Sequence, residues 1–445
     1  MYSMLYGPSL WNRKTSDFVF AGVVSSANHA TDCLIGGVGT RLISMKGFVV
    51  VVLLVLLGDV FAWWISARWL RRHRAGPLAV WACHLFFALQ MAYVLGMIGS
   101  AAMGSHTVRR GFSWMPRIVQ AVLFVWHLFA LPISILMWSA VHLLIWIRRR
   151  IPGGREGTPS IPASPPQEMA GMSRRDFMLA SIAAVPPLLA VGASGYGVIQ
   201  STHFRVNRIT IAIAGLPPLL HGFTLAHVSD LHVGLWSTDA FLDNVVRSTN
   251  ALDADVILFT GDLIDISTTQ LPRAIAVMRR LRARHGLYLT EGNHDLIENP
   301  AVFHQAMLES GLKFLRDQTA TITHNGQAVQ LLGAPWTRGN AGASSLQTLM
   351  QQRDANAFPI LMAHHPHLFD VAEQCGLPLT LSGHTHGGQF ALTREVNVGK
   401  MMYRYVSGLY QKGASTLFVS NGTGNWFPLR INAPAEIVQI TLTAI

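Results

Sequence analysis

Residues Thr224–His232, Thr-Leu-Ala-His-Val-Ser-Asp-Leu-His, decide the fold prediction for this chain. The apolar and β-branched residues predict a buried strand, which leads into Asp230 and His232, two positions apart. Side chains at positions i and i+2 of an extended segment point the same way, so this carboxylate and this imidazole can reach one metal ion. Because an isolated Asp-x-His occurs by chance in many proteins, the pair carries weight only if the pattern recurs.

The pattern recurs four times downstream, each time as an apolar strand that ends in residues able to bind a metal. The four ends are Gly261-Asp262-Leu263-Ile264-Asp265, Gly292-Asn293-His294-Asp295, His364-His365-Pro366 and Gly383-His384-Thr385-His386. Glycines allow tight turns in which such side chains crowd a common centre. A donor set of Asp, Asn and His without a thiolate suits moderately hard ions such as Mn, Fe or Zn.

Composition indicates membrane segments. The chain has 445 residues, of which 50% are hydrophobic and only 13% are charged. Residues 1–200 contain 17 Lys and Arg against 6 Asp and Glu, whereas residues 201–445 contain 17 of each, so the net charge of +11 lies in the first part. Basic residues that flank apolar runs are typical of membrane topology and give no support to nucleic-acid binding.

Three apolar runs within residues 45–150 predict transmembrane helices, because each is long enough for a hydrocarbon core about 30 Å thick. They are Gly47–Ile65, Leu78–Met103 and Ile118–Ile147. Arginines follow the first and the third run and place those ends in the cytoplasm. Arg109, Arg110 and Arg117 fall on the outer side and count against this orientation.

The segments around these helices are less regular. Residues 1–44 show no clear periodicity and form an uncertain N-terminal segment. Residues 151–172 are rich in Pro, Gly and Ser and predict a flexible cytoplasmic linker. Residues 173–200 begin with Ser173-Arg174-Arg175-Asp176-Phe177 and continue as the apolar run Leu179–Ile199. This resembles a twin-arginine export signal; the alternative is a fourth helix with ordinary cytoplasmic arginines. Both place residues 201–445 in the periplasm, attached to a bacterial inner membrane by a multi-pass anchor.

From residue 201 onward, short β-rich runs alternate with amphipathic helices, which predicts one α/β domain over residues 201–445. The ordered series D-x-H, G-D-x-x-D, G-N-H-D, H and G-H-x-H resembles that of the calcineurin-like metallophosphoesterases over residues 223–390. The ending Val419–Ile437 resembles the tail of membrane-associated members, which include UDP-diacylglucosamine pyrophosphatases. The resemblance implies a four-layer αββα sandwich, here preceded by an all-α transmembrane region.

The same resemblance implies two divalent metal ions at the carboxyl ends of the strands. One ion would be held by Asp230, His232 and His386, and the other by Asn293, His364 and His384. Asp262 would bridge them. His364 is preferred to His365 because the histidine of the family directly follows its strand.

The resemblance also implies a reaction. Two ions about 3.5–4 Å apart lower the pKa of a shared water and neutralise phosphate oxygens, so that a metal-bound hydroxide attacks phosphorus. His294 is the expected general acid, and Asp265 is expected to accept its other N–H. Family members that act on phosphoproteins have an Arg after the residue equivalent to Asp265, where this chain has Ile266.

The predicted function is therefore hydrolysis of a phosphodiester or pyrophosphate bond in a phosphorylated small molecule or lipid, such as an envelope precursor. The alternative is a membrane sensor that binds a phosphorylated ligand without turnover.

Two further groups of residues leave alternatives open. Ionisable residues in the apolar runs could line a site or bind haem, or could pack between helices; they are Asp59, His84, His127 and His142. Trp236 and the group Trp426-Phe427-Pro428 could form an apolar rim that dips toward lipid, or could belong to the core.

Overall fold

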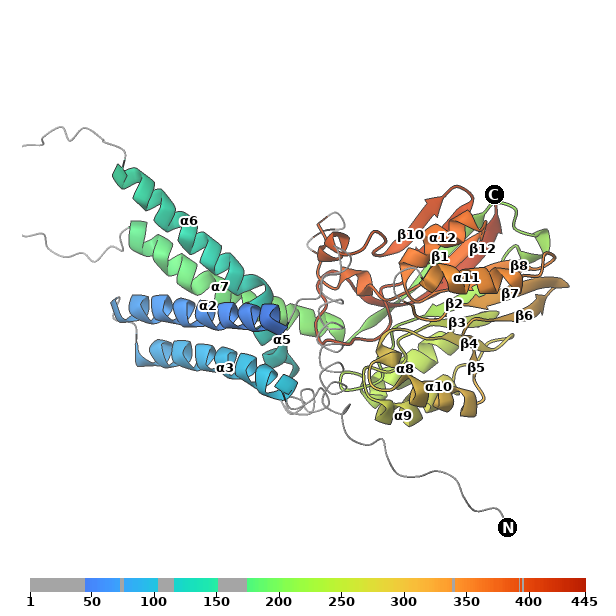
Figure 1. The fold of residues 1–445 in the computed structure, drawn as a ribbon, viewed down its shortest axis with the longest axis horizontal. Coiled ribbons are helices and arrows are strands. Elements are labelled where there is room, and N and C mark those ends of the chain that lie inside the picture. Colours follow the sequence, from blue (N-terminus) through green and yellow to red (C-terminus); the bar gives the residue numbers. More distant parts are fainter. Residues whose placement is uncertain are drawn as a thin grey trace, which may run out of the picture. The chain divides into compact units, whose positions relative to one another are not determined.

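The computed structural model describes residues 45–72, 76–102, 116–150, 174–337, 341–391, 393 and 396–445. These residues belong to two compact units, one that ends at Gly195 and one from Tyr196 to Ile445. The uncertain segment 1–44 and the predicted linker 151–172 lie outside the described residues. Figure 1 shows the helices of the first unit and the sheets of the second.

The first unit is helical, as predicted. Its elements are α2 (Met45–Arg72), α3 (Pro77–Ala102), α5 (Arg117–Val125), the π-helical turn Trp126–Ala130, α6 (Leu131–Arg150) and most of α7 (Arg174–Ser201). Among the described residues, three helical stretches are long and apolar enough to cross a membrane: Val52–Arg72, Pro77–Gly96 and Arg117–Leu144. The three predicted spans overlap these stretches. The fourth predicted span lies within α7, and its insertion into a membrane stays a prediction.

Asp59 is the buried polar centre of this helical unit. Its side chain is fully buried; Trp126 Nε1 donates to one carboxylate oxygen at 2.8 Å, and His127 Nε2 lies 3.0 Å from the other. Trp126 and His127 open the π-helical turn, a rare geometry often found at functional sites. The carboxylate thus connects α2 to the third apolar stretch.

The other two histidines of the apolar runs have aromatic neighbours. Trp63 Nε1 donates to His84 Nδ1 at 2.7 Å, and the exposed His142 ring stacks on Trp138 at 3.8 Å. These contacts favour packing roles over haem binding.

The second unit contains two six-stranded sheets. The first has the order β1-β12-β2-β3-β4-β5 and the second the order β10-β11-β9-β8-β7-β6. The strands are β1 (Phe204–Ile213), β2 (Thr224–Val228), β3 (Val256–Thr260), β4 (Leu287–Thr290), β5 (Lys313–Phe314), β6 (Gln318–His324), β7 (Gln327–Gly333), β8 (Phe358–Met362), β9 (Leu379–Ser382), β10 (Gly408–Lys412), β11 (Ser415–Val419) and β12 (Ala435–Ala444).

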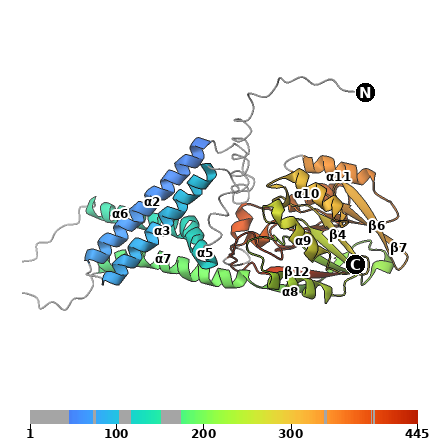
Figure 2. The same cartoon turned by 90° about the horizontal axis from the view of Figure 1, so that it is seen from below.

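Helices cover the outer face of each sheet, which confirms the predicted αββα sandwich. Helices α8 (Asp239–Asn250), α9 (Leu271–Met278) and α10 (Pro300–Glu309) pack on the first sheet, and Figure 2 shows this helical layer from below. Helices α11 (Ala341–Gln351) and α12 (Phe369–Gln374) pack on the second.

Successive side chains of a central strand point alternately to the helices and to the other sheet, which explains the layered arrangement. In β3, Ile257 and Phe259 pack toward the helices, whereas Val256 and Leu258 pack toward the second sheet. All five residues of this strand are buried. A strand covered on both faces is continuously apolar, which is why its sequence shows no polar alternation.

Parallel pairing aligns the strand ends. In the first sheet β2, β3 and β4 run parallel, with Val228 opposite Phe259 and Thr260 opposite Thr290. In the second sheet β8, β9 and β11 run parallel, with Met362 opposite Leu381. The loops after these strands therefore leave at common edges, and these loops carry the residues of the predicted site.

Candidate metal centre

The predicted ligands lie together at the carboxyl ends of the two sheets. Five of the seven have a positive φ: Asp230 (53°), His232 (46°), Asp262 (57°), His384 (70°) and His386 (50°). Residues other than glycine rarely adopt this conformation, which costs about 1–3 kcal/mol each and often occurs at functional sites. The sharp turns bring side chains from separate strands toward one centre.

The first group of ligand atoms comes from Asp230, His232 and His386. His386 Nε2 lies 3.0 Å from His232 Nε2 and 3.4 Å from Asp230 Oδ1. The three side chains are buried, and one ligand atom of each lies within 4.8 Å of the others. This is the group that the resemblance assigned to one ion.

The second group comes from Asn293, His364 and His384. Asn293 Oδ1 lies 2.8 Å from His384 Nδ1 and 3.2 Å from His364 Nε2, and these two nitrogens are 3.2 Å apart. Asp262 lies between the two groups, because its Oδ2 is 3.5 Å from His232 Nε2 and 3.2 Å from His364 Nε2. One carboxylate oxygen thus faces both groups, as a bridging ligand requires.

The donor set fits a pair of divalent ions. Imidazole nitrogens, carboxylates and one amide oxygen converge without a thiolate, which suits borderline and hard cations. Neighbouring glycines permit the approach: a Cβ added at Gly292 would lie 2.1 Å from Asp262 Oδ1, and one at Gly383 would lie 2.1 Å from Asp230 Oδ2. The residues that precede Asn293 and His384 are therefore small for a steric reason.

Burial and mutual charge shift the pKa values of these groups. Burial raises the pKa of Asp230 to about 6, although His364 lowers it. Burial disfavours ionised Asp262 too, but His364 and His294 bring its pKa below the ordinary value. Burial disfavours the His364 cation, yet Asp262 raises its pKa to about 9. Burial holds the pKa values of His384 and His386 well below the usual range, so these rings are neutral at pH 7.

His294 lies against both Asp262 and Asp265. Its backbone N–H donates to Asp262 Oδ1 at 2.8 Å, and its ring Nδ1 donates to the carbonyl oxygen of Asp265 at 2.5 Å. The sequence predicted that the Asp265 carboxylate would accept this bond. In the structure, Asp265 Oδ1 lies 3.6 Å from His294 Nδ1 and 3.8 Å from His232 Nδ1, so this oxygen is close to both rings but beyond hydrogen-bond distance of either.

Two features of the neighbouring histidines bear on the assignment. A ring nitrogen of His294 lies within 4.8 Å of ligand atoms of His232 and Asp262, so geometry alone also permits a ligand role for His294. His365, the alternative to His364, lies outside the three groups of possible ligands found among the described residues. Its Nδ1 instead lies 2.9 Å from His367 Nδ1.

Sequence reasoning assigned no role to Asp295, which holds the ligand loops together. Its two oxygens accept hydrogen bonds at 2.8–3.0 Å from the backbone N–H groups of Asp262, Leu263, Ile264 and Gly292. The carboxylate therefore joins the loop after β3 to the loop after β4. The sequence feature that could have indicated this role is the position of Asp295 in the motif Gly292-Asn293-His294-Asp295.

Aromatic rings border the centre. The Trp426 ring lies 6.1 Å from that of His294, and the Trp336 ring lies 5.1 Å from that of His384. Tyr403 Oη lies 3.4 Å from His384 Nε2. Trp236 and Trp426 are both partly buried, and Trp426 belongs to the border of the centre.

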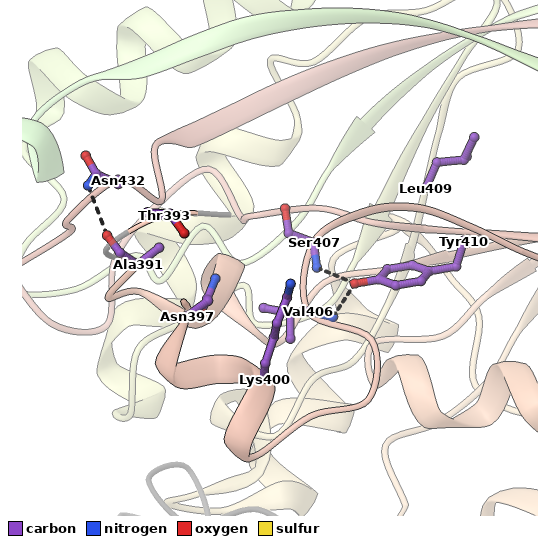
Figure 3. A pocket seen from close by; sticks show the side chains of 9 residues that line it. All are labelled: Ala391, Thr393, Asn397, Lys400, Val406, Ser407, Leu409, Tyr410 and Asn432. Atoms are coloured by element: carbon purple, nitrogen blue, oxygen red, sulfur yellow. Dashed lines mark hydrogen bonds between the residues drawn. The ribbon is translucent and has the colours of Figure 1, made fainter. Parts of the chain in front are cut away.

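A cavity of about 550 Å³ adjoins the loop that carries His384 and His386 (Figure 3). Thr385 Oγ1 donates to the carbonyl of Val406, a lining residue, and Asn397 Nδ2 donates to Gly387 O. Lys400 contributes a positive charge. Among the described residues, the lining consists of Ala391, Thr393, Asn397, Lys400, Val406, Ser407, Leu409, Tyr410 and Asn432. The cavity wall and the ligand loop are thus hydrogen-bonded to each other.

An αββα sandwich with carboxylate and imidazole groups gathered at its strand ends is the arrangement expected of a metal-dependent phosphoesterase. Residues 223–388 match the family described as calcineurin-like phosphoesterase. The metallophosphoesterase YkuE of Bacillus subtilis is 31% identical over 291 residues, which cover 62% of this chain and 99% of that one. The chain belongs to the calcineurin-like metallophosphoesterase family.

Other relatives share different parts of the chain. A transmembrane protein with metallophosphoesterase domain from Bos taurus is 25% identical over 96% of this chain and 95% of its own. A metallophosphoesterase of Helicobacter pylori strain J99 is 30% identical over 48% of this chain, and the match spans 58% of that relative.

The pKa of His364 leads to a pH prediction. Below about pH 9 this ring carries a proton in the metal-free protein, and an ion that binds its Nε2 must displace it. The affinity for that ion should therefore rise about tenfold per pH unit between about pH 7 and 8.5 and level off near pH 9. Isothermal titration of the chelator-treated protein with Mn²⁺ at several pH values measures this slope. His365→Ala is the control and should keep it, whereas a flat affinity in the wild type would contradict the prediction.

Proposed function

We propose that the chain hydrolyses a phosphodiester or pyrophosphate bond, with a phosphorylated lipid or envelope precursor as the substrate class. The observation that carries the proposal is the pair of ligand groups that share Asp262. Two ions bound there would activate a water molecule and neutralise phosphate oxygens. Mn, Fe and Zn all suit the nitrogen and oxygen donors. The cavity beside the ligand loop offers room for the part of the substrate beyond the reacting phosphate.

The ligands would have distinct roles. Asp230, His232 and His386 would hold one ion, Asn293, His364 and His384 the other, and Asp262 both. His364 Nδ1 donates to the carbonyl of Thr260 at 2.7 Å, which leaves Nε2 as its ligand atom. Such a bond from the second ring nitrogen fixes the tautomer and orientation of a ligating histidine.

His294 would act as the general acid. Its Nδ1–H is bound to the carbonyl of Asp265, so Nε2 is the atom that can give a proton to the leaving oxygen. The Asp265 carboxylate, 3.6 Å from Nδ1, would stabilise the imidazolium before transfer. Ile266 stands where phosphoprotein phosphatases of the family have an arginine, which favours diester or pyrophosphate substrates.

The membrane location is part of the proposal. Within the described part of the chain, three helical stretches are long and apolar enough to span a membrane, and the Bos taurus relative is named a transmembrane protein. We infer a multi-pass protein of a bacterial inner membrane with the phosphoesterase domain, residues 201–445, in the periplasm. Residues 151–172 would form the cytoplasmic linker, and the segment from Ser173 an export signal or a fourth helix.

A fusion tests the orientation. Alkaline phosphatase, active only after export, should be active when fused after Ile445, and a cytoplasm-only reporter at the same position should be inactive. The reverse pattern would overturn the periplasmic placement. Replacing both Arg174 and Arg175 by Lys tests the export route: twin-arginine export predicts loss of display, and unchanged display supports an ordinary fourth helix.

A leaving-group series tests the role of His294. His294→Ala should retain both ions and lose about 10²–10⁴-fold in turnover on alkyl diesters, because proton transfer to the leaving oxygen is worth about that much. On nitrophenyl esters, whose anion leaves without a proton, the loss should be small. The measurement is turnover against leaving-group pKa, with metal content checked in parallel.

The control for this series is His285→Ala, since His285 lies near the amino end of β4, at the opposite edge of the sheet. Loss of an ion in His294→Ala would assign His294 as a ligand, and equal losses for all leaving groups would exclude it as the proton donor. Metal binding by the wild type without hydrolysis of any diester or pyrophosphate would favour the sensor alternative.

A further inference from the structure

Arg430 is a fully buried arginine directly behind the ligand His386. Its side chain has 0% exposure, and its guanidinium donates to neutral acceptors. These are Asn425 Oδ1 (2.5 Å), Gly424 O (2.7 Å), Asn421 O (2.8 Å), Ala433 O (2.9 Å), His386 Nδ1 (2.9 Å) and His386 O (3.4 Å). Burying a cation costs free energy unless its hydrogen-bond donors are satisfied. The six contacts satisfy the donors of this guanidinium, so the surrounding residues accommodate it as a buried cation.

The contact with His386 determines how that ring is turned. A guanidinium can only donate hydrogen bonds, so His386 Nδ1 is the acceptor. With Nδ1 bound to Arg430, Nε2 faces Asp230 Oδ1 at 3.4 Å and His232 Nε2 at 3.0 Å. Arg430 thereby holds the ring with Nε2 toward these two side chains. Because Nδ1 accepts, the neutral ring carries its proton on Nε2. To bind an ion through Nε2, the ring would have to release this proton, and the adjacent guanidinium cation would favour the resulting anionic ring.

The same arginine is connected to the last turn of α7, which lies in the same compact unit from Tyr196 onward. Asn425 accepts from Arg430 Nε and donates through Nδ2 to Ser201 O at 2.7 Å. A continuous hydrogen-bonded path therefore runs from Ser201 through Asn425 and Arg430 to His386. The backbone N–H of Arg430 also donates to Gly197 O at 3.1 Å, which fixes the start of this path against α7.

The tail Val419–Ile437, which resembles that of membrane-associated family members, contains Arg430, but the pattern does not reveal what this residue contacts. The residues matched by the family end at 388, and Arg430 lies beyond them. The segment that carries it also packs on the centre, because a Cβ added at Gly422 would lie 2.7 Å from Asp230 Cβ. Strand β12, which follows, is an inner strand of the first sheet between β1 and β2. The segment is therefore part of the wall of the centre.

We propose that Arg430 is a positioning residue for the ion held by Asp230, His232 and His386, and that it links the last turn of α7 to that ion. The proposal rests on the metal assignment of the proposed function. It does not depend on catalysis, because an orientation held in the metal-free protein affects metal affinity first. The segment that enters from the predicted anchor would thus help to set the geometry of one of the two ion sites.

Metal titration of the full chain in detergent tests the proposal. After chelation, wild type and variants are titrated with Mn²⁺ and, for the absorption spectrum, with Co²⁺. Arg430→Lys and Arg430→Gln should lose about 10–100-fold in affinity for one ion, the usual effect of removing a partner of a ligand. The other ion should bind within about threefold of wild type, and the Co²⁺ absorption should change for the first ion alone. His384→Ala identifies which binding step belongs to the other ion.

Two further variants separate positioning from folding. Arg273→Gln is the matched control, because Arg273 also donates to a backbone carbonyl, that of Ser237, but lies on α9 away from the ligands; it should leave both affinities unchanged. Asn425→Ala removes the bond to Ser201 O and keeps both Arg430 and His386, and should show a smaller loss for the same ion.

Several outcomes would overturn the proposal. Equal loss of both ions with a lowered melting temperature would assign Arg430 a purely structural role. Tighter binding in Arg430→Gln would show that its charge opposes the ion and that its hydrogen bond does not position the ring. Metal affinities of the Arg430 variants equal to those of the wild type would also exclude the proposal. So would a wild-type protein that binds fewer than two ions. A wild type that binds two ions and hydrolyses nothing would contradict the proposed function alone, because these measurements do not use turnover.

Discussion

The hydrogen bond from His364 Nδ1 to the carbonyl of Thr260, 2.7 Å long, is the contact on which the centre depends. It joins the end of β8 in the second sheet to the end of β3 in the first. Because the bond uses Nδ1, it leaves Nε2 directed at Asp262 Oδ2, 3.2 Å away. The apolar layer between the sheets brings the two edges together. This bond, together with the one from the His384 backbone N–H to Asp230 Oδ1 at 3.0 Å, holds the predicted ligands of both sheets close to one another.

The centre concentrates features that are unfavourable in isolation. Buried carboxylates lie close to one another, several ligand residues have a positive φ, and burial disfavours the charged forms of Asp230 and His386. The chain offsets part of this cost by pairing the His364 cation with Asp262 and by giving Asp295 four backbone N–H donors. Such an arrangement is stable only where the surrounding sandwich over-determines it, and it is suited to cations.

The sequence predicted the layered fold and the place of the centre because both depend on local patterns. An apolar strand that ends in Asp230 or Asp262 is visible in a short window, and parallel strands then force the ends together. The three long apolar runs were visible for the same reason. The central position of β12 between β1 and β2 was not predictable, because strand order depends on pairing between distant segments.

The contacts of single residues were harder to predict than which side chains gather at the centre. Arg430 is 44 residues from His386 in sequence, and its contact exists only because the tail folds back under the ligand loop. The bond of His294 to the carbonyl of Asp265, in place of the carboxylate, follows from the path of a loop that Asp295 holds. Backbone acceptors and buried cations leave no periodic signal in a sequence.

The most direct test of the central claim is the metal content and turnover of Asp262→Asn. An amide oxygen at this position carries no negative charge, so it would be a much weaker bridge between two cations than the carboxylate oxygen that faces both groups. We expect two ions per wild-type chain, loss of at least one ion in the variant, and loss of nearly all hydrolysis of a bis-nitrophenyl phosphodiester. Elemental analysis that finds two ions retained in the variant, together with normal turnover, would contradict the central claim.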